Sequence, residues 1–493
     1  MSVTLGAVLD RLRAESLITG IPDELETALQ VDAITTDSRF VRPGTLFCAV
    51  RGAAGDGHDF LAAAADSGAV ATLVELEAPG VSVPQIRVGS TRRAAAFAAA
   101  ELYDDPWNGI TLIGVTGTNG KTTTVEVLRH LLARSGRAAS MGTLGLIGPD
   151  GRRLPGAANL TTPGPAQFAE EMRRLVDDGV QAVAMEVSSH ALAQERVAAA
   201  RFSAAIYTNL SRDHLDYHGT FEEYRAAKLK LLGLIGSGGV AAANVDDPAW
   251  ATISRDGVHI IRFGTQGRGE VQAENIRYGA DGADWHLHTP SCTSPVHLPL
   301  FGPFNVYNAL GAAAALWGLG WRAEQIAEGL AIVGQVPGRL ERIPGVAGPT
   351  ILIDYAHTPD ALERALQALR PFVEGRLIVV FGAGGDRDRG KRPEMGRVAA
   401  ENADLSIVTS DNPRHEDPVA IAAQIEAGMG DAPRLRILDR REAIARALEL
   451  ATPSDLVLLA GKGHETYQVW GDEHRPFDER LVVAELLEQG IGR

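Results

Sequence analysis

A glycine-rich segment that ends in lysine and threonine is the part of the chain best suited to chemistry. It follows an apolar run and reads Gly114-Val115-Thr116-Gly117-Thr118-Asn119-Gly120-Lys121-Thr122-Thr123. A strand, a Gly-rich turn and a helix N-terminus present backbone N–H groups and a positive dipole end to phosphates. Lys121 would then neutralise the β- and γ-phosphates of a nucleotide, and the Thr122 hydroxyl would meet Mg²⁺. The spacing departs from the standard loop, which has a glycine where this chain has Val115.

A carboxylate at the end of an apolar run has the chemistry of a ligand for a hard metal ion, and a histidine stands in a later polar segment. Glu186 ends the apolar run QAVAMEVS, and His214 stands in the polar segment SRDHLDYHG among Asp213, Asp216 and His218. Carboxylate oxygens are ligands that Mg²⁺ prefers. Strand-end carboxylates are often only solvated, and a lone loop histidine is more often structural, so these residues alone leave the metal site open.

Lysine is scarce in this chain, although basic residues are not. Of 47 Lys and Arg residues, five are lysines: Lys121, Lys228, Lys230, Lys391 and Lys462. A GC-rich coding bias would explain the preference for arginine over lysine without any functional reason. Each lysine that remains nevertheless marks a position where a compact ammonium or a reactive amine is of use, because arginine supplies neither. Lys230 has no motif around it and is expected at the surface.

The side chains named above must be positioned by helices and strands. The first 335 residues predict two α/β units. Residues 1 to about 105 mix short strand-like runs with Ala-rich helical stretches, and YDDPWNG at 103–109 has the turn chemistry of a linker. Strand-like runs with helices between them then recur from TLIGVTG to about residue 247, which predicts a mostly parallel sheet. The more alternating stretch at about 258–300 predicts antiparallel strands.

The last third of the chain predicts a doubly wound sheet. After a hinge at VPG, 336–338, the apolar runs TILIDYAH, RLIVVFGAGG, LSIVTSD and DLVLLAG each end in a polar cluster. Functional groups of such a domain lie at the carboxyl ends of its strands. The expected fold is therefore α/β, with domains at about 1–105, 106–335 and 336–493.

Length and composition limit the possible classes of protein. A chain of 493 residues holds about three domains. The formal charge of −15 argues against nucleic acid as a partner. The sequence shows no signal peptide and no apolar run of about 20 residues, so we expect a cytoplasmic protein without a membrane partner. Cys48 and Cys292 share no motif. We expect a monomer.

The motifs, taken in order, resemble those of the Mur ligases and their folylpolyglutamate synthase relatives. The resemblance covers nearly the whole chain and is greatest to the MurE-type branch. It rests on TTDSR, TNGKTT, TTPGP, MEVSSHAL, TNLSRDHLDYHGT, AAK, GPFNVYN, VPGRLE, DYAHTPDAL, FGAGGDRDRGKRP, DNPR and GKGHE.

The resemblance implies an ATP-dependent ligase of cell-wall precursor synthesis. Such an enzyme adds meso-diaminopimelate to UDP-N-acetylmuramoyl-L-alanyl-D-glutamate through an acyl phosphate. The implied domains are an N-terminal UDP-binding α/β domain, a central P-loop ATPase-like domain with a mostly parallel sheet, and a C-terminal Rossmann-like domain.

The resemblance also implies the metal chemistry of the site. Thr122, Glu186 and His214 match ligands of Mg²⁺. Lys228, in a helix expected over 221–234, matches a lysine that carries a CO₂-derived carbamate, whose oxygens hold a second Mg²⁺. A helical lysine is ordinarily a surface residue. Only an uncharged primary amine forms a carbamate, so retention of lysine here agrees with that role.

The remaining implied contacts fall into three sets. Residues matching ATP contacts are Gly117, Thr118, Asn119, Gly120, Lys121, Thr122, Thr123, Asn305, Asn308, Arg339 and Asp354. Residues matching contacts to the UDP-substrate are Thr36, Ser38, Ala53, Ala54, Gly55, Thr161, Thr162, Ser188, Gln194 and Arg196. Residues matching diaminopimelate contacts are Arg387, Asp411, Asn412, Pro413, Arg414, Gly461 and Glu465.

Three alternatives remain open from the sequence. The same ligase could add L-lysine or L-ornithine. Another family member, such as the D-Ala-D-Ala-adding ligase or folylpolyglutamate synthase, is disfavoured by TTDSR and DNPR. A P-loop NTPase switch that binds a protein partner would need no amino-acid pocket.

Overall fold

The computed structural model describes residues 1–52, 55–155, 160–279, 281–343 and 348–492. By its internal contacts the chain separates into two compact units. The first holds Met1–Ala273, Leu287–Ser294 and Tyr307–Gly329, and the second holds Glu274–His286, Pro295–Val306 and Leu330–Arg493. Within the described residues, no helix has the length and apolar character needed to cross a membrane.

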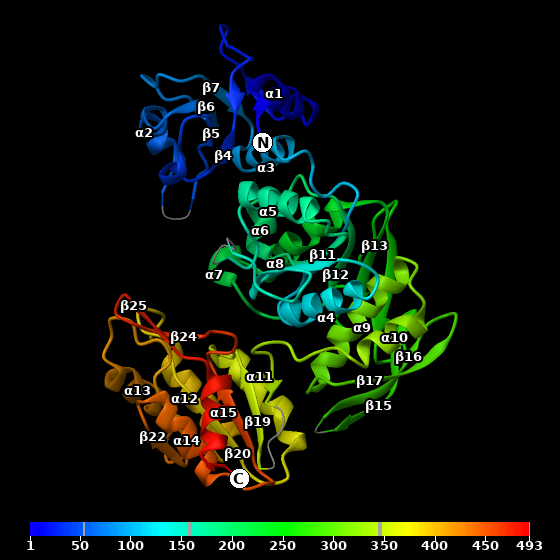
Figure 1. Ribbon diagram of the computed structural model, residues 1–493, viewed down its shortest axis with the longest axis vertical. Helices are drawn as coiled ribbons and strands as arrows, with labels where there is room; N and C mark the ends of the chain where they lie inside the picture. The colour runs from blue at the N-terminus through cyan, green and yellow to red at the C-terminus, as the bar shows by residue number, and fades with distance from the viewer. Residues whose placement is uncertain (53–54, 156–159, 280, 344–347, 493) are drawn as a thin grey trace. The chain divides into compact units, whose positions relative to one another are not determined.

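The first unit begins with a five-stranded sheet in the order β2-β7-β6-β5-β4 (Figure 1). Strands β4 to β7 run parallel. Helix α3 covers this sheet with an apolar face of alanines and Phe97, and the Ser90 side chain caps its first turn. The elements are β1 Val3–Thr4, α1 Leu5–Ala14, β2 Ile18–Gly20, β3 Gln30–Val31, β4 Ala33–Thr35, β5 Thr45–Cys48, α2 Leu61–Asp66, β6 Ala69–Val74, β7 Gln85–Val88 and α3 Thr91–Leu102.

A larger sheet follows, with the order β10-β9-β11-β8-β12-β13-β14-β15-β16-β17. From β9 to β14 it is parallel, and its central strands are buried on both faces, as parallel sheets require. Its strands are β8 Thr111–Thr116, β9 Ala138–Gly142, β10 Gly145–Ile147, β11 Ala182–Glu186, β12 Phe202–Tyr207, β13 Ile235–Asn244, β14 His259–Gly264, β15 Val271–Gly279, β16 Gly282–His288 and β17 Thr293–Leu298.

Seven helices of the described chain accompany these strands. They are α4 Lys121–Ala133, α5 Pro165–Asp177, α6 Ser189–Ala193, α7 Leu215–His218, α8 Phe221–Leu229, α9 Pro303–Gly318 and α10 Ala323–Leu330. The helix expected over 221–234 ends at Leu229 and continues as a 3-10 helix, Lys230–Leu234.

One expectation for this sheet was wrong. Strand β14 was expected to be antiparallel, but it runs parallel to both β13 and β15. The first residue of β14 is exposed and the next three are only partly buried. The sequence of β14, His-Ile-Ile-Arg-Phe-Gly, does not itself alternate, so the alternation of the stretch as a whole gave no information on the direction of this strand.

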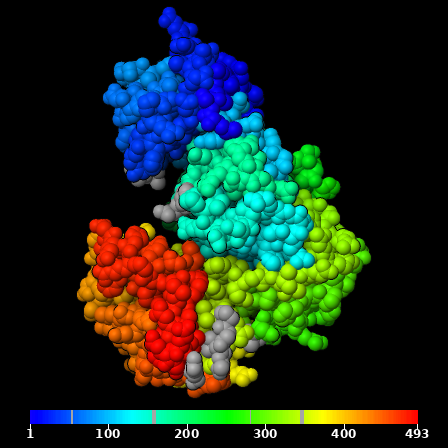
Figure 2. Space-filling view, viewed as in Figure 1, coloured from blue at the N-terminus to red at the C-terminus, as the bar shows by residue number. Residues whose placement is uncertain are grey.

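The C-terminal sheet has the order β18-β19-β23-β20-β21-β22 and is parallel except for β18. Alternate residues of β20 enter two cores. Leu377, Val379 and Phe381 pack with α11, α12 and α13, whereas Ile378 and Val380 pack with α14 and α15. Helices on both faces confirm the doubly wound arrangement. Residues after about 450, red in Figure 2, form a strip of this unit's surface.

The elements of this part are β18 Glu341–Arg342, β19 Thr350–Asp354, α11 Pro359–Leu369, β20 Leu377–Phe381, α12 Lys391–Asn402, β21 Leu405–Val408, α13 Pro418–Glu426, β22 Arg434–Arg436, α14 Arg440–Leu450, β23 Leu456–Ala460, β24 Tyr467–Trp470, β25 Glu473–Pro476 and α15 Glu479–Glu488. All four apolar runs of the sequence are strands of the sheet.

Candidate active site

The glycine-rich loop joins β8 to α4, as its sequence predicts. Gly117 and Gly120 adopt positive φ values of 153° and 83°. A Cβ atom on Gly117 would lie 1.9 Å from Thr208 Oγ1, and one on Gly120 would lie 2.2 Å from Asn308 Oδ1. Only glycine fits both positions. Asn308 of α9, predicted as an ATP contact, therefore lies against the loop.

The segment after β12 holds this loop in place. Thr118 N–H donates to the carbonyl oxygen of Asn209 at 2.8 Å, and Asn119 N–H donates to Asn209 Oδ1 at 3.0 Å. The Thr208 hydroxyl donates to the Asn119 carbonyl oxygen at 2.7 Å. Our sequence analysis gave Thr208 and Asn209 no role, although they open the motif TNLSRDHLDYHGT. They shape the loop that the sequence predicts.

Lys121 turns back over the loop that precedes it. Its ammonium donates to the carbonyl oxygens of Gly117 at 3.0 Å and Thr118 at 2.7 Å. Thr122 and Thr123, in the first turn of α4, are buried. A cation and a helix N-terminus thus share one loop, which is the arrangement that binds phosphate.

Lys228 is buried, in contrast to an ordinary helical lysine. Its side chain is 1% exposed, and Nζ donates to the Gly117 carbonyl oxygen at 2.7 Å. The ammonium also lies 4.5 Å from the centre of the Tyr224 ring. Burial, and then the charge of Lys121, lower the pKa of Lys228 well below its usual value, against a smaller opposing effect of Asp213. The site therefore favours the uncharged amine.

Tyr224 connects Lys228 with the predicted histidine ligand, and our sequence analysis did not assign it a role. Its hydroxyl lies 3.2 Å from Thr118 Oγ1. Its ring centre lies 6.1 Å from that of His214, and a second ring, His190, lies 4.8 Å from His214. His214 has a positive φ of 52° and is about half exposed.

His218, to which the sequence assigned no metal role, lies beside the same rings, 5.4 Å from His190 and 5.2 Å from Tyr224 between ring centres. Its Nε2 is 3.0 Å from the Ser189 hydroxyl, and the residue is buried. Burial and the neighbouring His214 lower the pKa of His218. Its burial and its contact with Ser189 suit a structural histidine.

Glu186 ends β11 and is buried. Its carboxylate accepts hydrogen bonds from the backbone N–H of Thr143 at 2.8 Å and from the Thr143 hydroxyl at 3.2 Å. Its own carbonyl oxygen accepts from the Thr162 hydroxyl at 2.9 Å. In the described stretches of the chain, no three His, Cys, Asp or Glu side chains form a ready metal cluster. The predicted ligand set, however, includes a hydroxyl and a modified lysine.

Four of the residues predicted to contact the muramoyl dipeptide lie together beside Glu186. Ser188 N–H donates to Thr162 Oγ1 at 3.1 Å. The Arg196 guanidinium donates to the Thr162 carbonyl oxygen at 2.8 Å and, with two nitrogens, to Gln194 Oε1 at 3.1 and 2.7 Å. The structure brings these side chains together although 34 residues separate Thr162 from Arg196. Thr161 adjoins them in sequence and is partly exposed.

The residues predicted to contact uridine diphosphate follow two neighbouring strands. Thr36 and Ser38 come after β4, and Gly55 comes after β5, which pairs parallel with β4. Carboxyl ends of parallel strands lie at one edge of a sheet, so both segments leave the same edge. Gly55 accepts a hydrogen bond from Gly52 N–H at 2.8 Å. Ala53 and Ala54 lie outside the described residues.

The second unit holds the other residues predicted to bind ATP. Both carboxylate oxygens of Asp354 accept backbone hydrogen bonds, from Leu340 at 2.8 Å and Ala356 at 2.9 Å. Burial raises the pKa of Asp354. The Arg339 guanidinium lies 5.4 Å from the Tyr355 ring centre. Asp354 thus shapes the segment that carries Arg339.

Asn305 and Lys391 are each tied to a backbone carbonyl of the second unit. The Asn305 amide is buried and donates to the Phe301 carbonyl oxygen at 2.7 Å. Lys391, at the start of α12, donates to the carbonyl oxygen of His357 at 2.9 Å. His357 and Lys391, from two separate motifs, are therefore neighbours.

The segment DNPR follows β21 and carries most of the predicted diaminopimelate contacts. Asp411, Asn412 and Pro413 are buried. Arg414 has a positive φ of 50°, and its guanidinium donates to the Gly385 carbonyl oxygen at 2.8 Å. Its backbone N–H donates to Val469 at 3.0 Å, which ties the segment to β24. One nitrogen of the Arg414 guanidinium, Nη1, is thus held by the protein.

Other predicted members of this set lie around it. Arg387 is exposed, and it and Arg414 both approach the position of a Cβ on Gly384. Gly461, with φ of 112°, follows β23 and has Asp411 beside it. The Asn412 side chain donates to Glu465 Oε2 at 2.9 Å. Lys462 lies among these residues, and our sequence analysis gave it no role, although its rarity as a lysine marked it.

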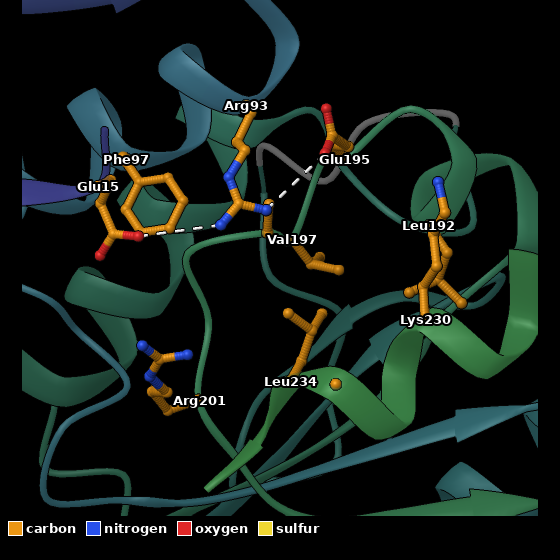
Figure 3. A pocket seen from close by; sticks show the side chains of 11 residues that line it. Glu15, Arg93, Phe97, Leu192, Glu195, Val197, Arg201, Lys230 and Leu234 are labelled. Atoms are coloured by element: carbon orange, nitrogen blue, oxygen red, sulfur yellow. Dashed lines mark ion pairs between the residues drawn. The ribbon is translucent and has the colours of Figure 1, made fainter. Parts of the chain in front are cut away.

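A cavity of about 370 Å³ lies apart from these residues, between α3 and the segments that follow α6 and α8 (Figure 3). Arg93 lies at its edge, 3.8 Å from Glu15 and 3.9 Å from Glu195. Lys230, exposed as expected, is also part of the lining. The lining residues include none of the predicted site residues.

Family models match three segments of the chain. The model described as Mur ligase family, catalytic domain, matches residues 30–103. The Mur ligase middle domain matches residues 115–316, and the Mur ligase, glutamate ligase domain, matches residues 338–463.

Curated relatives match over almost the full chain. The UDP-N-acetylmuramoyl-L-alanyl-D-glutamate–2,6-diaminopimelate ligase of Geobacter metallireducens is 43% identical over 94% of this chain and 96% of its own length. The protein of the same name from Geobacillus thermodenitrificans is 44% identical over 93% of this chain and 95% of its own.

Solved structures agree with these relatives. A structure titled as a UDP-N-acetylmuramoyl-L-alanyl-D-glutamate–2,6-diaminopimelate ligase superposes with a TM-score of 0.71 at 32% identity, covering 99% of both chains. The MurF ligase of Thermotoga maritima in complex with ADP shares the fold, with a TM-score of 0.59 at 20% identity over 93% of this chain and 97% of that one. The chain therefore belongs to the Mur ligase family, whose three-domain α/β fold it shares.

Proposed function

We propose that this protein is an ATP-dependent ligase that joins meso-diaminopimelate to the D-glutamate of UDP-N-acetylmuramoyl-L-alanyl-D-glutamate. It would release ADP and phosphate, and it would act in cytoplasmic peptidoglycan precursor synthesis. Relatives that carry this name and cover more than nine tenths of the chain support the substrates. The observation that carries the chemistry is the contact of both Lys121 and Lys228 with the Gly117 carbonyl of the phosphate loop.

The reaction needs an activated acid, because a carboxylate is a poor electrophile. The substrate carboxylate attacks the γ-phosphorus of ATP, so that an acyl phosphate forms and ADP leaves. The amine of the amino acid then attacks the acyl carbon, phosphate leaves, and the amine loses its proton. The substrate carboxylate and the triphosphate of ATP are both anions and must approach each other. The loop and Lys121 contribute by binding the phosphates and stabilising their negative charge. Residues 117–123 bind the phosphates, and Asn305, Asn308, Arg339 and Asp354 support the adenosine.

The residues proposed to hold Mg²⁺ are Thr122, Glu186, His214 and Lys228. Glu186 offers a buried carboxylate, and the low pKa of Lys228 favours the uncharged amine that reacts with CO₂. That reaction forms an N–C bond, releases one proton and leaves a carbamate with two oxygen ligands. When bound, Mg²⁺ supplies positive charge beside the phosphates. Three of the four would supply the oxygen atoms that a hard cation prefers, and His214 would supply a ring nitrogen.

The substrates are assigned to three groups of residues. Thr36, Ser38 and the loop Ala53-Ala54-Gly55 take the uridine diphosphate, and Thr161, Thr162, Ser188, Gln194 and Arg196 take the muramoyl dipeptide. Arg387, Asp411, Asn412, Pro413, Arg414, Gly461 and Glu465 take diaminopimelate. The groups belong to proposed domains at about 1–105, 106–335 and 336–493 of a monomer.

One assay tests the proposal. Purified protein is given ATP, Mg²⁺ and the UDP-dipeptide, and ADP release is followed with diaminopimelate, L-lysine or L-ornithine. We expect release that requires both the UDP-dipeptide and diaminopimelate. Preference for lysine or ornithine would overturn the amino acid but not the ligase. ADP release that needs neither substrate would instead indicate an NTPase switch.

A further inference from the structure

Lys462 is a buried lysine to which the proposed reaction assigns no role. Its side chain is 0% exposed. The ammonium lies 2.9 Å from Glu465 Oε2, 3.0 Å from Asn412 Oδ1 and 3.4 Å from Asp411 Oδ1. An ammonium that is removed from water is costly unless charges and acceptors surround it. Lys462 is therefore held in place by the three residues it contacts.

The same lysine fixes the orientation of the Asn412 amide. Asn412 Oδ1 accepts from Lys462 and also from the backbone N–H of Val469 at 3.0 Å. Its Nδ2 donates to Glu465 Oε2 at 2.9 Å. An amide whose oxygen and nitrogen both have such partners cannot flip without losing hydrogen bonds on each side. Asn412 and Glu465 are thus held as one rigid pair.

Each carboxylate keeps one oxygen away from the lysine. Lys462 contacts Oδ1 of Asp411 and Oε2 of Glu465, so Oδ2 and Oε1 are left for another cation. Two carboxylates and one ammonium sum to a charge of −1. Arg440 also acts on Asp411, but it is paired with Glu479 at 2.8 Å and adds no net charge. The charge of Lys391 acts on Asp411 as well. The two carboxylate oxygens that Lys462 does not contact match a single ammonium group.

We propose that Lys462 is a positioning residue that presets Asp411, Asn412 and Glu465 to receive an ammonium group of the incoming diamino acid. This inference rests on the proposed function and adds the residue that organises its amino-acid site. Without the lysine, two carboxylates would face each other in a buried place and repel. Arginine cannot substitute for Lys462, because its guanidinium is larger and planar, whereas the fully buried position holds a compact ammonium.

The test compares Lys462→Met with Lys230→Met, a matched change at an exposed lysine outside the site. KM and kcat are measured for the amino acid, ATP and the UDP-dipeptide. We expect Lys462→Met to raise KM for diaminopimelate about tenfold or more, with the other two KM values within about twofold of the unmodified enzyme. Lysine as a substrate should lose the same factor, because both amino acids carry the ammonium. Lys230→Met should leave all values unchanged.

A lysine that only supports the fold predicts a different result. It would lower the melting temperature and the yield of folded enzyme, but KM of the folded fraction would stay the same. That outcome, or an equal rise of all three KM values, overturns the inference. Lys462→Gln keeps a polar group and serves if the methionine variant does not fold, with the same expected rise in KM. If the unmodified enzyme releases no ADP in response to any amino acid, the proposed function fails instead.

Discussion

The side-chain nitrogen of Lys228 lies 2.7 Å from the carbonyl oxygen of Gly117, and Lys121 donates to the same oxygen at 3.0 Å. Two ammonium groups that share one acceptor repel each other, and the more buried of them is the one more easily deprotonated. The pKa of Lys228 is lowered accordingly, first by burial and then by Lys121. The fold thus places an amine whose pKa is lowered directly behind the phosphate loop.

The first prediction concerns this amine. Lys228→Ala should lower kcat by at least about 10²-fold, because the carbamate and its metal contact are lost. Short carboxylic acids such as acetate should partly restore the activity of the alanine variant. Lys228→Arg should be as poor as alanine and should not respond to acetate, since arginine keeps the charge but cannot react with CO₂. Steady-state rates measure the loss and the rescue of activity. ¹³C NMR of enzyme supplied with ¹³CO₂ detects the carbamate. An arginine variant close to the unmodified enzyme would show that no carbamate is needed.

The second prediction concerns the phosphate loop. Lys121→Ala should reduce product formation by at least about 10²-fold, because the lost charge faces the transferring phosphoryl group. The melting temperature should change little, since the two hydrogen bonds of Lys121 described above join it to carbonyl oxygens of its own loop. Lys230→Ala serves as the control for removal of a lysine. Normal turnover by a folded Lys121→Ala variant would contradict the assignment of the ATP site.

The third prediction concerns amino-acid specificity. Arg414→Ala should lower kcat/KM for diaminopimelate about 10- to 100-fold, because a charge-assisted pair with its far carboxylate is lost. Lysine lacks that carboxylate and should be affected far less. Arg414→Lys should rescue poorly, since an ammonium does not reproduce the planar fork. Arg434→Ala, at an exposed arginine of β22, is the control. Equal losses for both amino acids would mean that Arg414 is structural.

The fourth prediction concerns stability and pH. Burial raises the pKa of Glu171 to about 7, although the hydrogen bond from Gln167 opposes this. The folded state therefore binds this proton more tightly than the unfolded state does. The contribution of Glu171 to stability is fully present below its ordinary pKa of 4.5 and is lost as pH rises through about 7.

Glu171→Gln removes this titration and should raise the melting temperature more at pH 8 than at pH 5. Thermal unfolding of both proteins across this range measures the difference. Glu170→Gln, at the exposed neighbouring position, should show no such trend. A Glu171→Gln variant whose advantage is the same at pH 5 and pH 8 would disprove the buried titration.

The sequence by itself determined the elements that depend on neighbouring residues. Helix α4, Lys121–Ala133, begins directly after the Gly-rich turn, as expected, because Gly120 and the apolar run before it act locally. Four of the six strands of the C-terminal sheet follow equally from short apolar runs that end in polar clusters. The family, too, follows from motifs that are continuous in sequence, and matches over more than nine tenths of the chain confirm it.

Tertiary structure alone decided which charged groups are buried and what they contact. Lys228 reaches Gly117 across 111 residues, and Lys462 reaches Asn412 across 50. The direction of β14 was likewise decided by its pairing with β13 and not by the pattern of its own residues. The periodicity of apolar residues predicts which side of a strand or helix is buried. Burial of a lysine depends instead on which distant segments of the chain pack against it.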